Sequence, residues 1–368
     1  MSRIGMVLIG DIRYDGRVRK EIETLVRAGH HVELVVSDFG KTASGGEDLG
    51  INIHYINMTL WSQPVMNFLE QLLFNLKAAS TLKNLSVSHL HCHDLSALLA
   101  GVWTKKRLKA KLIFDAHELM PESMGGIKEK IWGQIEKRSI NSCDHIIMPE
   151  KNRIAYFKRK YIGIPEPLLL ENFPRRSELP TKAFDLFRTR YPIKKSQVII
   201  LYSGTVDSQR YIEELIESIS LSSTHFVLVI LGRTFKSYKE TLQTKIKKLS
   251  LKDRAFLHEP VAHAKILEYM ASCDIGIALY PNTNINNYFC ASNKLYEYIA
   301  LSKIVLTNNY PGLLESVERF KQGLCLPEVS AQSLEEAYRY VSTPFNITPG
   351  ARKFFWEDYS TILTDFYD

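Results

Sequence analysis

The sequence predicts an α/β protein built from two doubly wound domains, each a parallel sheet with helices on both faces. Short apolar runs alternate with amphipathic segments of helical period along both halves of the chain, which is the pattern of repeated strand–helix units. A length of 368 residues also exceeds what one hydrophobic core usually organises. A polar stretch at 175–195, which contains two prolines, indicates a linker between the halves. We therefore expect an N-terminal domain at 1–175, a second domain at 176–350, and a C-terminal helix at 351–368 that packs back toward the first domain.

Composition narrows the class of ligand and the cellular compartment. The formal net charge of +7 favours phosphorylated ligands or an anionic membrane surface, but the basic residues are too scattered to indicate nucleic acid. The five cysteines are widely spaced and form no CxxC pair, which favours reduced thiols over disulfides or zinc. No signal peptide is apparent, and no apolar run approaches the ~20 residues of a membrane span. We expect a cytoplasmic protein, either soluble or peripheral on the inner face of the membrane.

The first strand–helix–strand unit places a loop where parallel sheets bind ligands. The apolar run Ile4–Ile9 predicts a strand, 17–28 predicts a helix that ends at Gly29, and 31–36 predicts the next strand. The loop at 10–16 therefore lies at the carboxyl end of the first strand. It lacks both GxGxxG and GxxxxGK[ST], so it supports neither a dinucleotide fingerprint nor a P-loop. Gly16 has two interpretations: close approach of the backbone to a phosphate, or a simple turn.

Residues 57–85 form a wide apolar segment with few charges. Two interpretations stay open: a buried crossing helix, or a hydrophobic lip that meets a lipid or a lipid-linked substrate. A basic run at 105–111 is either a solvated helix end or a contact for an anionic bilayer. The apolar side chains of the segment are Met58, Leu60, Trp61, Val65, Met66, Phe68, Leu69, Leu72, Leu73, Phe74 and Leu76.

Two histidine clusters follow predicted strands. His91 and His93 alternate in the first cluster, 89–94, but no second Cys/His pair at a known spacing accompanies them, so we expect no metal. The second cluster contains His117 and Glu118 directly after an apolar strand. A histidine at such a position can donate to or accept from a substrate hydroxyl or phosphate.

The second half repeats the strand–loop–helix pattern and contains the most informative stretch, 291–299. A Ser292-Asn293 pair there precedes an apolar-periodic helix, which is good N-cap chemistry. The remaining amides of the first turn and the positive end of the helix dipole suit a phosphate. Glu297, about one turn in, has the carboxylate to hold a pair of sugar hydroxyls. The alternative is a capped helix with a surface glutamate.

Taken in order, these motifs resemble those of the glycosyltransferase family 4 enzymes, which have the GT-B fold. The resemblance spans nearly the whole chain, at sensible spacings. The matching stretches are Asp11–Glu21, Ala28–Val32, His91–Asp94, Asp115–Leu119, Asn172, Ser203–Thr205 and Asn293–Glu297.

The resemblance implies two Rossmann-like domains that face each other across a cleft. It also implies a retaining hexosyltransferase that moves a sugar from a nucleotide-diphosphate sugar to the hydroxyl of a saccharide or lipid-linked acceptor. Such an enzyme would serve cell-surface polysaccharide or glycolipid synthesis. It needs neither a cofactor nor a metal, because helix amides and basic side chains carry the diphosphate charge.

The resemblance also implies roles for individual residues. His117 and Arg210 would be catalytic, the first beside the transferred sugar and the second at the leaving diphosphate. The donor-binding set would be Gly16, Gly204, Thr205, Gly232, Ser292, Asn293, Lys294 and Glu297. Within that set, Ser292 and Asn293 would offer backbone amides to the terminal phosphate, and Glu297 would bind the ribose. The acceptor-side candidates are Asp11, Arg13, Asp94 and Glu118.

Two departures from the family pattern leave other functions open. Phe289 stands where the family commonly has the first glutamate of Glu-x7-Glu, and Tyr211 stands where a lysine usually follows the arginine. Leaving-group stabilisation would then fall on Arg210, helped by Lys294. One alternative is a non-catalytic nucleotide-binding scaffold. Another is a sugar-nucleotide epimerase of the same fold, for which Asp115 and Glu118 are the local acid–base candidates.

Overall fold

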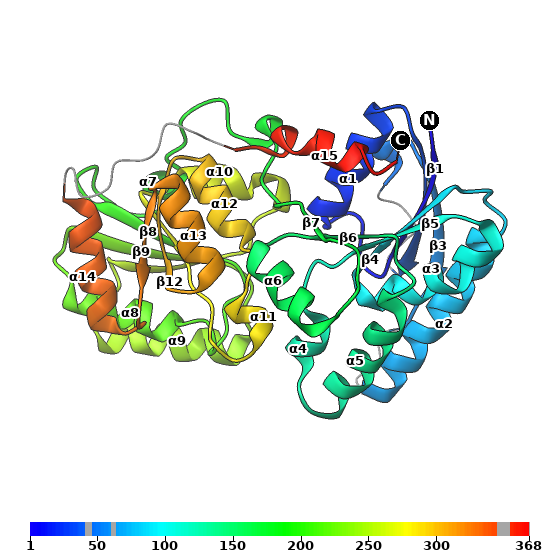
Figure 1. Ribbon diagram of the computed structural model, residues 1–368. Helices are drawn as coiled ribbons and strands as arrows, with labels where there is room; N and C mark the ends of the chain where they lie inside the picture. Colours follow the sequence, from blue (N-terminus) through cyan, green and yellow to red (C-terminus); the bar gives the residue numbers. More distant parts are fainter. Residues whose placement is uncertain (41–45, 60–63, 344–353, 368) are drawn as a thin grey trace. The chain divides into compact units, whose positions relative to one another are not determined.

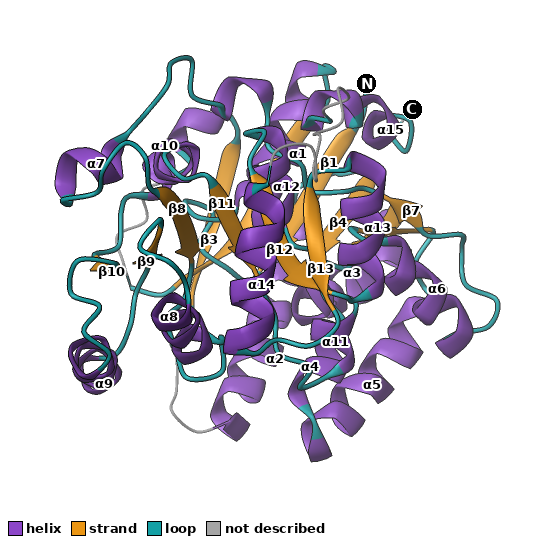
Figure 2. Ribbon diagram, turned by 90° about the vertical axis from the view of Figure 1, so that its left-hand side faces the viewer, coloured by secondary structure: helices purple, strands orange, loops and turns teal. Residues whose placement is uncertain are grey.

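The computed structural model describes residues 1–40, 46–59, 64–343 and 354–367, and it divides into two compact units (Figure 1). Unit 1 comprises Met1–Glu171, Asn284–Asn286 and Glu357–Asp368. Unit 2 comprises Asn172–Thr283 and Asn287–Trp356. Each unit contains a parallel sheet between helices (Figure 2), which confirms the predicted fold class of two doubly wound α/β domains.

The sheet of unit 1 has seven parallel strands in the order β3-β2-β1-β4-β5-β6-β7. Its central strands are buried along almost their whole length, because helices cover both faces of a parallel sheet. The strands are β1 (Arg3–Leu8), β2 (His31–Asp38), β3 (Asn52–Asn57), β4 (His89–His93), β5 (Lys111–Asp115), β6 (His145–Met148) and β7 (Leu168–Leu169). The helices are α1 (Gly16–Arg27), α2 (Pro64–Leu82), α3 (Asp94–Leu108), α4 (Met120–Met124), α5 (Gly126–Ile140), α6 (Lys151–Lys160) and α15 (Ser360–Thr364).

The sheet of unit 2 has six parallel strands in the order β10-β9-β8-β11-β12-β13. Its strands are β8 (Val198–Ser203), β9 (Phe226–Leu231), β10 (Ala255–His258), β11 (Ile275–Ala278), β12 (Ile304–Asn308) and β13 (Gly323–Leu326). The helices are α7 (Leu186–Arg190), α8 (Ile212–Leu221), α9 (Lys236–Lys248), α10 (Ile266–Ala271), α12 (Asn293–Ala300), α13 (Pro311–Phe320) and α14 (Ala331–Ser342). The short helix α11 (Ile285–Tyr288) begins in the segment of unit 1 and ends in unit 2. Strands β8, β9 and β11 pack against α8, α9 and α14 in one continuous apolar core.

The first histidine cluster lies inside a strand, so the expectation that it follows one was wrong. His89, His91 and His93 all belong to β4, which pairs with β1 on one side and β5 on the other. A strand in the middle of a covered sheet buries every side chain, and His91 and His93 are fully buried. Asp94 is the first residue after β4, at the carboxyl end of the strand, and α3 begins there.

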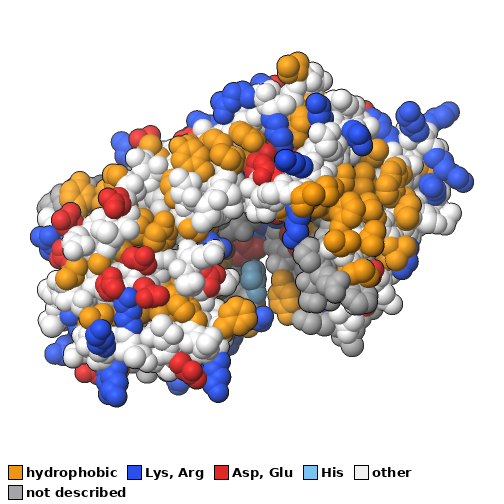
Figure 3. Space-filling model, turned by 90° about the horizontal axis from the view of Figure 1, so that it is seen from below, with side chains coloured by type: hydrophobic (Ala, Val, Ile, Leu, Met, Phe, Trp, Pro, Cys, Tyr) orange, Lys and Arg blue, Asp and Glu red, His pale blue; other side chains and the backbone are white. Residues whose placement is uncertain are grey.

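Helix α2 has two apolar faces with different surroundings. One face, which includes Phe74, Ala78 and Leu82, is buried in unit 1. The other is exposed, and Figure 3 shows hydrophobic side chains gathered on this part of the surface. Of the helices in the described part of the chain, none is both long and apolar enough to cross a membrane. Leu60 and Trp61, which the sequence assigned to the apolar segment, lie outside the described residues.

Candidate functional site

Strands β8 and β9 of unit 2 bring two glycine loops into contact. Gly204 follows β8 and Gly232 follows β9, and the two strands are neighbours in the sheet. A Cβ atom at Gly232 would lie 1.6 Å from the carbonyl oxygen of Gly204, so no side chain fits at that position. Gly204 has a positive φ of 136° and donates its N–H to the carbonyl of Leu231 at 2.9 Å. These two glycines let the loops at the carboxyl edge of the sheet pack backbone against backbone.

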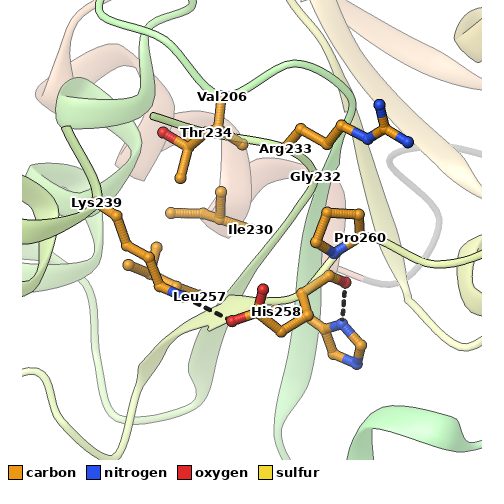
Figure 4. A pocket seen from close by; sticks show the side chains of 10 residues that line it. Val206, Ile230, Gly232, Arg233, Thr234, Lys239, Leu257, His258 and Pro260 are labelled. Atoms are coloured by element: carbon orange, nitrogen blue, oxygen red, sulfur yellow. Dashed lines mark hydrogen bonds and ion pairs between the residues drawn. The ribbon is translucent and has the colours of Figure 1, made fainter. Parts of the chain in front are cut away.

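A cavity of about 240 Å³ opens beside this glycine contact (Figure 4). Its floor is apolar, made by Val206, Ile230 and Leu257. Its rim is polar: Lys239 Nζ pairs with Glu259 at 2.6 Å, and His258 Nδ1 donates to the Glu259 carbonyl at 2.7 Å. The other lining residues are Gly232, Arg233, Thr234 and Pro260. An apolar slot with polar groups at its edge suits a flat heterocyclic ring. Among these lining residues, the sequence had singled out only Gly232.

Helix α12 begins as its sequence predicts. Ser292 is the N-cap, and its Oγ accepts a hydrogen bond from the Leu295 N–H at 3.1 Å. Tyr280 fixes this cap from the preceding loop, since its hydroxyl lies 2.7 Å from Ser292 Oγ. The Asn293 side chain accepts a hydrogen bond from Asn172 at 3.0 Å, so two residues of the sequence motifs meet here. The amides of the first turn not bonded to Ser292 retain their tendency to bind anions.

Two cationic side chains of unit 2, Lys294 and Arg210, lie near the same aromatic ring and have no close carboxylate partner among the described residues. Lys294 Nζ lies 4.9 Å from the Tyr202 ring centroid and 5.4 Å from that of Tyr280, and the Arg210 guanidinium lies 6.0 Å from the Tyr280 centroid. In the described part of the chain no carboxylate pairs with Lys294, and Arg210 reaches Asp207 only at 4.0 Å. Burial, followed by repulsion from Arg210, lowers the pKa of Lys294 to about 8. Attraction from Glu297 offsets only part of this lowering, so a bound anion would add favourable charge beside both cations.

The same loops position the remaining predicted residues of unit 2. Thr205 is exposed, and its carbonyl accepts a hydrogen bond from Tyr202 at 2.6 Å. Tyr211 adopts a left-handed conformation, φ 57°, directly before α8. Glu297 is half-buried in the second turn of α12, three residues after Lys294. Lys294 also lies close to Gly204, because a Cβ atom added at Gly204 would lie 3.0 Å from Lys294 Nζ.

Unit 1 contains a buried ion cluster at the carboxyl ends of β4 and β5. Arg17 of α1 donates to both carboxylate oxygens of Asp115 at 2.9 Å, and to the Leu170 carbonyl at 2.8 Å. It also lies 3.1 Å from the carboxylate of Glu21, one turn further along α1. All three charged side chains are buried. The sequence placed Arg17 and Glu21 in a stretch that matches the family but gave them no role. They share the inward face of α1 with Val18, as their i,i+4 spacing permits.

His117 lies between two carboxylates of this cluster. Its Nε2 donates to Asp115 Oδ2 at 3.0 Å, its Nδ1 lies 3.5 Å from Asp94, and its backbone N–H donates to Asp94 at 2.9 Å. Burial alone would lower the pKa of His117, but Asp94 and Asp115 outweigh burial and raise it to about 10. His117 is therefore an imidazolium at neutral pH, with its ring oriented by both carboxylates.

Replacing Asp94 with Asn should lower the pKa of His117. The amide oxygen can still accept the His117 N–H, so the loop keeps its hydrogen bond, but one of the two charges that stabilise the imidazolium is lost. We expect the pKa to fall from about 10 to roughly 9 or below. An NMR titration of the imidazole resonances measures it, with His145 as an internal reference. An unchanged pKa would show that Asp94 does not act on the ring electrostatically.

The other predicted residues of unit 1 lie in loops, except Gly16, which begins α1. Asp11 and Arg13 pair with each other at 2.6 Å within the loop after β1. Gly16 is the first residue of α1, and a Cβ there would meet nothing within 4 Å, so this glycine leaves open space at the helix N-terminus. Glu118 is exposed and accepts a hydrogen bond from Asn286 at 3.3 Å. Asn286 also accepts the Leu119 N–H at 2.9 Å, which fixes the loop that contains His117.

Four side chains of the cluster have the chemistry of metal ligands. One ligand atom from each of Glu21, His91, His93 and Asp115 lies within 4.8 Å of the others. Arg17, however, already bonds both oxygens of Asp115 and lies against Glu21, so a cation is built into the cluster. Burial and the Asp115 charge raise the pKa of Glu21 well above its ordinary value. The Arg17 guanidinium therefore already supplies positive charge to this group of side chains.

Two family models match successive parts of the chain. The model described as Glycosyltransferase Family 4 matches residues 17–167, and the one described as Glycosyl transferases group 1 matches residues 184–343. No curated protein is similar enough in sequence to match.

Solved structures with the same fold cover the whole chain at low identity. Sucrose-phosphate synthase from Thermosynechococcus elongatus is 15% identical with a TM-score of 0.78, covering 100% of this chain and 98% of its own. Anabaena Alr3699/HepE, solved in complex with UDP-glucose, is 15% identical with a TM-score of 0.70, covering 100% and 96%. A protein from Listeria monocytogenes that is described as a UDP-N-acetylglucosamine 2-epimerase is 10% identical with a TM-score of 0.69. The match covers 99% of this chain and 96% of that protein.

Two parallel-sheet Rossmann-like domains of this kind make up the GT-B fold. The two family matches together extend through both units of the chain. The protein belongs to glycosyltransferase family 4.

Proposed function

We propose that this glycosyltransferase moves a hexose from a nucleotide-diphosphate sugar to an acceptor hydroxyl with retention of configuration. The observation that carries the proposal is the pair of cations Arg210 and Lys294. Both lie near the Tyr280 ring, and among the described residues neither has a close carboxylate partner. A diphosphate supplies the two or more negative charges that this pair lacks. Because Anabaena Alr3699/HepE was solved with UDP and with UDP-glucose, a UDP-sugar is the first donor to test.

Each part of the unit 2 site has a role in this proposal. The cavity beside Gly232 receives the base, because its apolar floor suits a flat ring. Glu297 holds the ribose hydroxyls, and the amides that follow Ser292 bind the terminal phosphate. Arg210 and Lys294 stabilise the charge that develops on the diphosphate as the bond to the anomeric carbon breaks. Lys294 then takes the place of the family lysine that Tyr211 replaces.

In this proposal, unit 1 binds the transferred sugar and the acceptor. His117 is the contact for the transferred sugar, because its imidazolium can donate a hydrogen bond to a sugar hydroxyl. Gly16 leaves room for a phosphate at the N-terminus of α1. The loop residues Asp11, Arg13, Asp94 and Glu118 are the acceptor-side candidates. No side chain is assigned as a base, because the departing phosphate oxygen can take the acceptor proton.

The proposed reaction uses no cofactor and no metal ion. The diphosphate charge that a divalent cation carries in other transferases is met by Arg210, Lys294 and the helix amides. We further propose that the acceptor is a saccharide or a lipid-linked saccharide of the cell surface, and that the protein acts in the cytoplasm, at the inner face of the membrane. The exposed apolar face of α2 and the net charge of +7 support a membrane location.

A thermal-shift titration tests the donor site. A ligand that binds the folded protein raises the melting temperature by mass action, so one nucleoside diphosphate, UDP first, should stabilise the protein in the presence of EDTA. Replacing Glu297 with Gln should weaken UDP about tenfold but leave pyrophosphate binding unchanged, because only UDP offers a ribose. Equal loss for both ligands would remove Glu297 from the ribose. No stabilisation by any nucleotide would favour a non-catalytic scaffold.

The hydrogen bonds of Asp115 argue against the epimerase alternative. It needs carboxyl groups that exchange protons with the sugar, and Asp115 is buried and bonded on both oxygens by Arg17. Burial would raise the pKa of Asp115, but Arg17 and His117 outweigh it and hold this pKa well below its ordinary value, so the group stays ionised.

A further inference from the structure

Two helices of unit 1 each present an exposed apolar stripe. Helix α2 exposes side chains at successive turns of one face, and α5 does the same at its N-terminal end. Their exposed fractions range from 43% to 75%. The members of this surface, which we call the α2–α5 face, are Val65, Leu69, Leu73, Leu76, Ile127 and Ile131.

The two stripes belong to neighbouring helices. Phe68 of α2 packs edge-on against Trp132 of α5, with ring centroids 5.4 Å apart. Phe68 is only partly exposed and Trp132 is buried, so the two helices meet at this contact while the residues of both stripes remain exposed. Figure 3 shows the resulting orange area on the surface. A contiguous apolar area on a folded unit usually marks an interaction site.

The charges around the α2–α5 face have one dominant sign. In α5, Lys128 and Lys130 are exposed next to Ile127 and Ile131. Across the described side chains of α2, α3 and α5, the exposed basic residues are Lys77, Lys106, Arg107, Lys128, Lys130, Lys137 and Arg138. The exposed acidic residue in the same set is Glu129. Helix α3 adds a partly exposed Trp103, a side chain that favours the headgroup region of a bilayer.

We propose that the α2–α5 face docks on an anionic phospholipid bilayer. Apolar side chains enter the boundary between headgroups and acyl chains, and the lysines beside them pair with lipid phosphates. This inference deepens the proposed function, because it names the surface by which the enzyme reaches a lipid-linked acceptor. A second copy of the chain fits less well, since two such faces would place their lysines against each other.

Co-sedimentation with vesicles tests the docking. The full-length protein should bind vesicles of phosphatidylcholine that contain about 30% phosphatidylglycerol, and it should bind pure phosphatidylcholine at least about tenfold more weakly. Replacing Leu69 and Leu73 with Ser should reduce binding to anionic vesicles at least about tenfold. Replacing Lys128 and Lys130 with Gln should do the same at low salt, and high salt should weaken the wild type.

Matched controls separate docking from folding and from catalysis. Leu221→Ser with Ile362→Ser removes two exposed apolar side chains outside the face, and Lys247→Gln with Lys248→Gln removes two exposed lysines of unit 2. Both should bind vesicles like the wild type. Each variant should keep the nucleotide-induced thermal shift, which reports the donor site independently of membrane binding. Wild-type binding by the Leu69/Leu73 variant would overturn the proposal. So would a dimer that the same substitutions dissociate in the absence of vesicle binding.

Discussion

Replacing Lys294 with Met is expected to lower kcat/KM for the sugar donor about 100-fold, the typical cost of removing one preorganised charge at a leaving group. Met matches the length of Lys but removes the charge beside Arg210. Most of the loss should appear in kcat if Lys294 acts on the charge that develops in the transition state. Initial-rate kinetics at several donor concentrations measure this division.

The same substitution should stabilise the free protein. The pKa of Lys294 lies near 8 in the folded state, below its ordinary value of 10.5, so at pH 7 folding must keep a partly desolvated cation charged. We expect Met to raise the free energy of unfolding by roughly 1–3 kcal/mol at pH 7. Between about pH 8 and 10.5, Lys294 is protonated in the unfolded chain but largely neutral in the folded protein. The free energy of unfolding of the wild type therefore rises with pH over this range, and the difference between the Met variant and the wild type becomes smaller.

Lys265→Met is the matched control, because Lys265 is exposed elsewhere in unit 2. It should change neither kcat/KM nor stability appreciably. If Lys294→Met keeps wild-type kcat/KM, the anion site is elsewhere. If it loses activity and stability together, Lys294 supports the fold rather than the leaving group.

Replacing Arg17 with Met is expected to lower the free energy of unfolding by about 3–5 kcal/mol. The substitution removes the guanidinium that bonds both oxygens of the buried Asp115, and it leaves the nearby Glu21 without its cation. A buried carboxylate without its partner costs far more than an exposed one. Urea unfolding at pH 7 measures the loss.

Lys158→Met provides the comparison within unit 1. Lys158 pairs with Glu166 at 2.7 Å, a shorter contact than those of Arg17, but both partners are exposed. It should cost less than about 1 kcal/mol. Similar costs for the two substitutions would mean that burial does not set the strength of the Arg17 cluster.

Local chemistry was sufficient to predict the N-cap at Ser292. Ser292 precedes an apolar-periodic helix, and the cap at α12 depends only on that short stretch. Arg17 was missed because a charged residue in the first turn of a helix usually faces solvent. Its burial depends on Asp115, 98 residues further along the chain, which the order of the sheet brings beside α1. The contact of Gly204 with Gly232 likewise requires β8 and β9 to be neighbours.

The fold class followed from the repeated strand–helix pattern, but some elements did not. Strand β3 reads Asn-Ile-His-Tyr-Ile-Asn and lies at the edge of its sheet, so it lacks the apolar run that identifies the central strands. In α2, apolar residues occur on the buried and the exposed face alike. Hydrophobicity therefore could not tell Phe74, which is buried, from Leu73, which is exposed.

Unit 1 is assembled from both ends of the polypeptide, and this has a consequence for biosynthesis. The Tyr367 hydroxyl lies 2.6 Å from His91 in the middle of the sheet, and Ser2 Oγ donates to the Tyr367 carbonyl at 2.6 Å. On a ribosome that adds about 5–20 residues per second, the intervening residues 172–356 take roughly 10–40 s to make. During that interval the nascent first unit lacks the aromatic side chain that covers its buried histidines. Unit 2 can complete its own contacts first, although it is translated later.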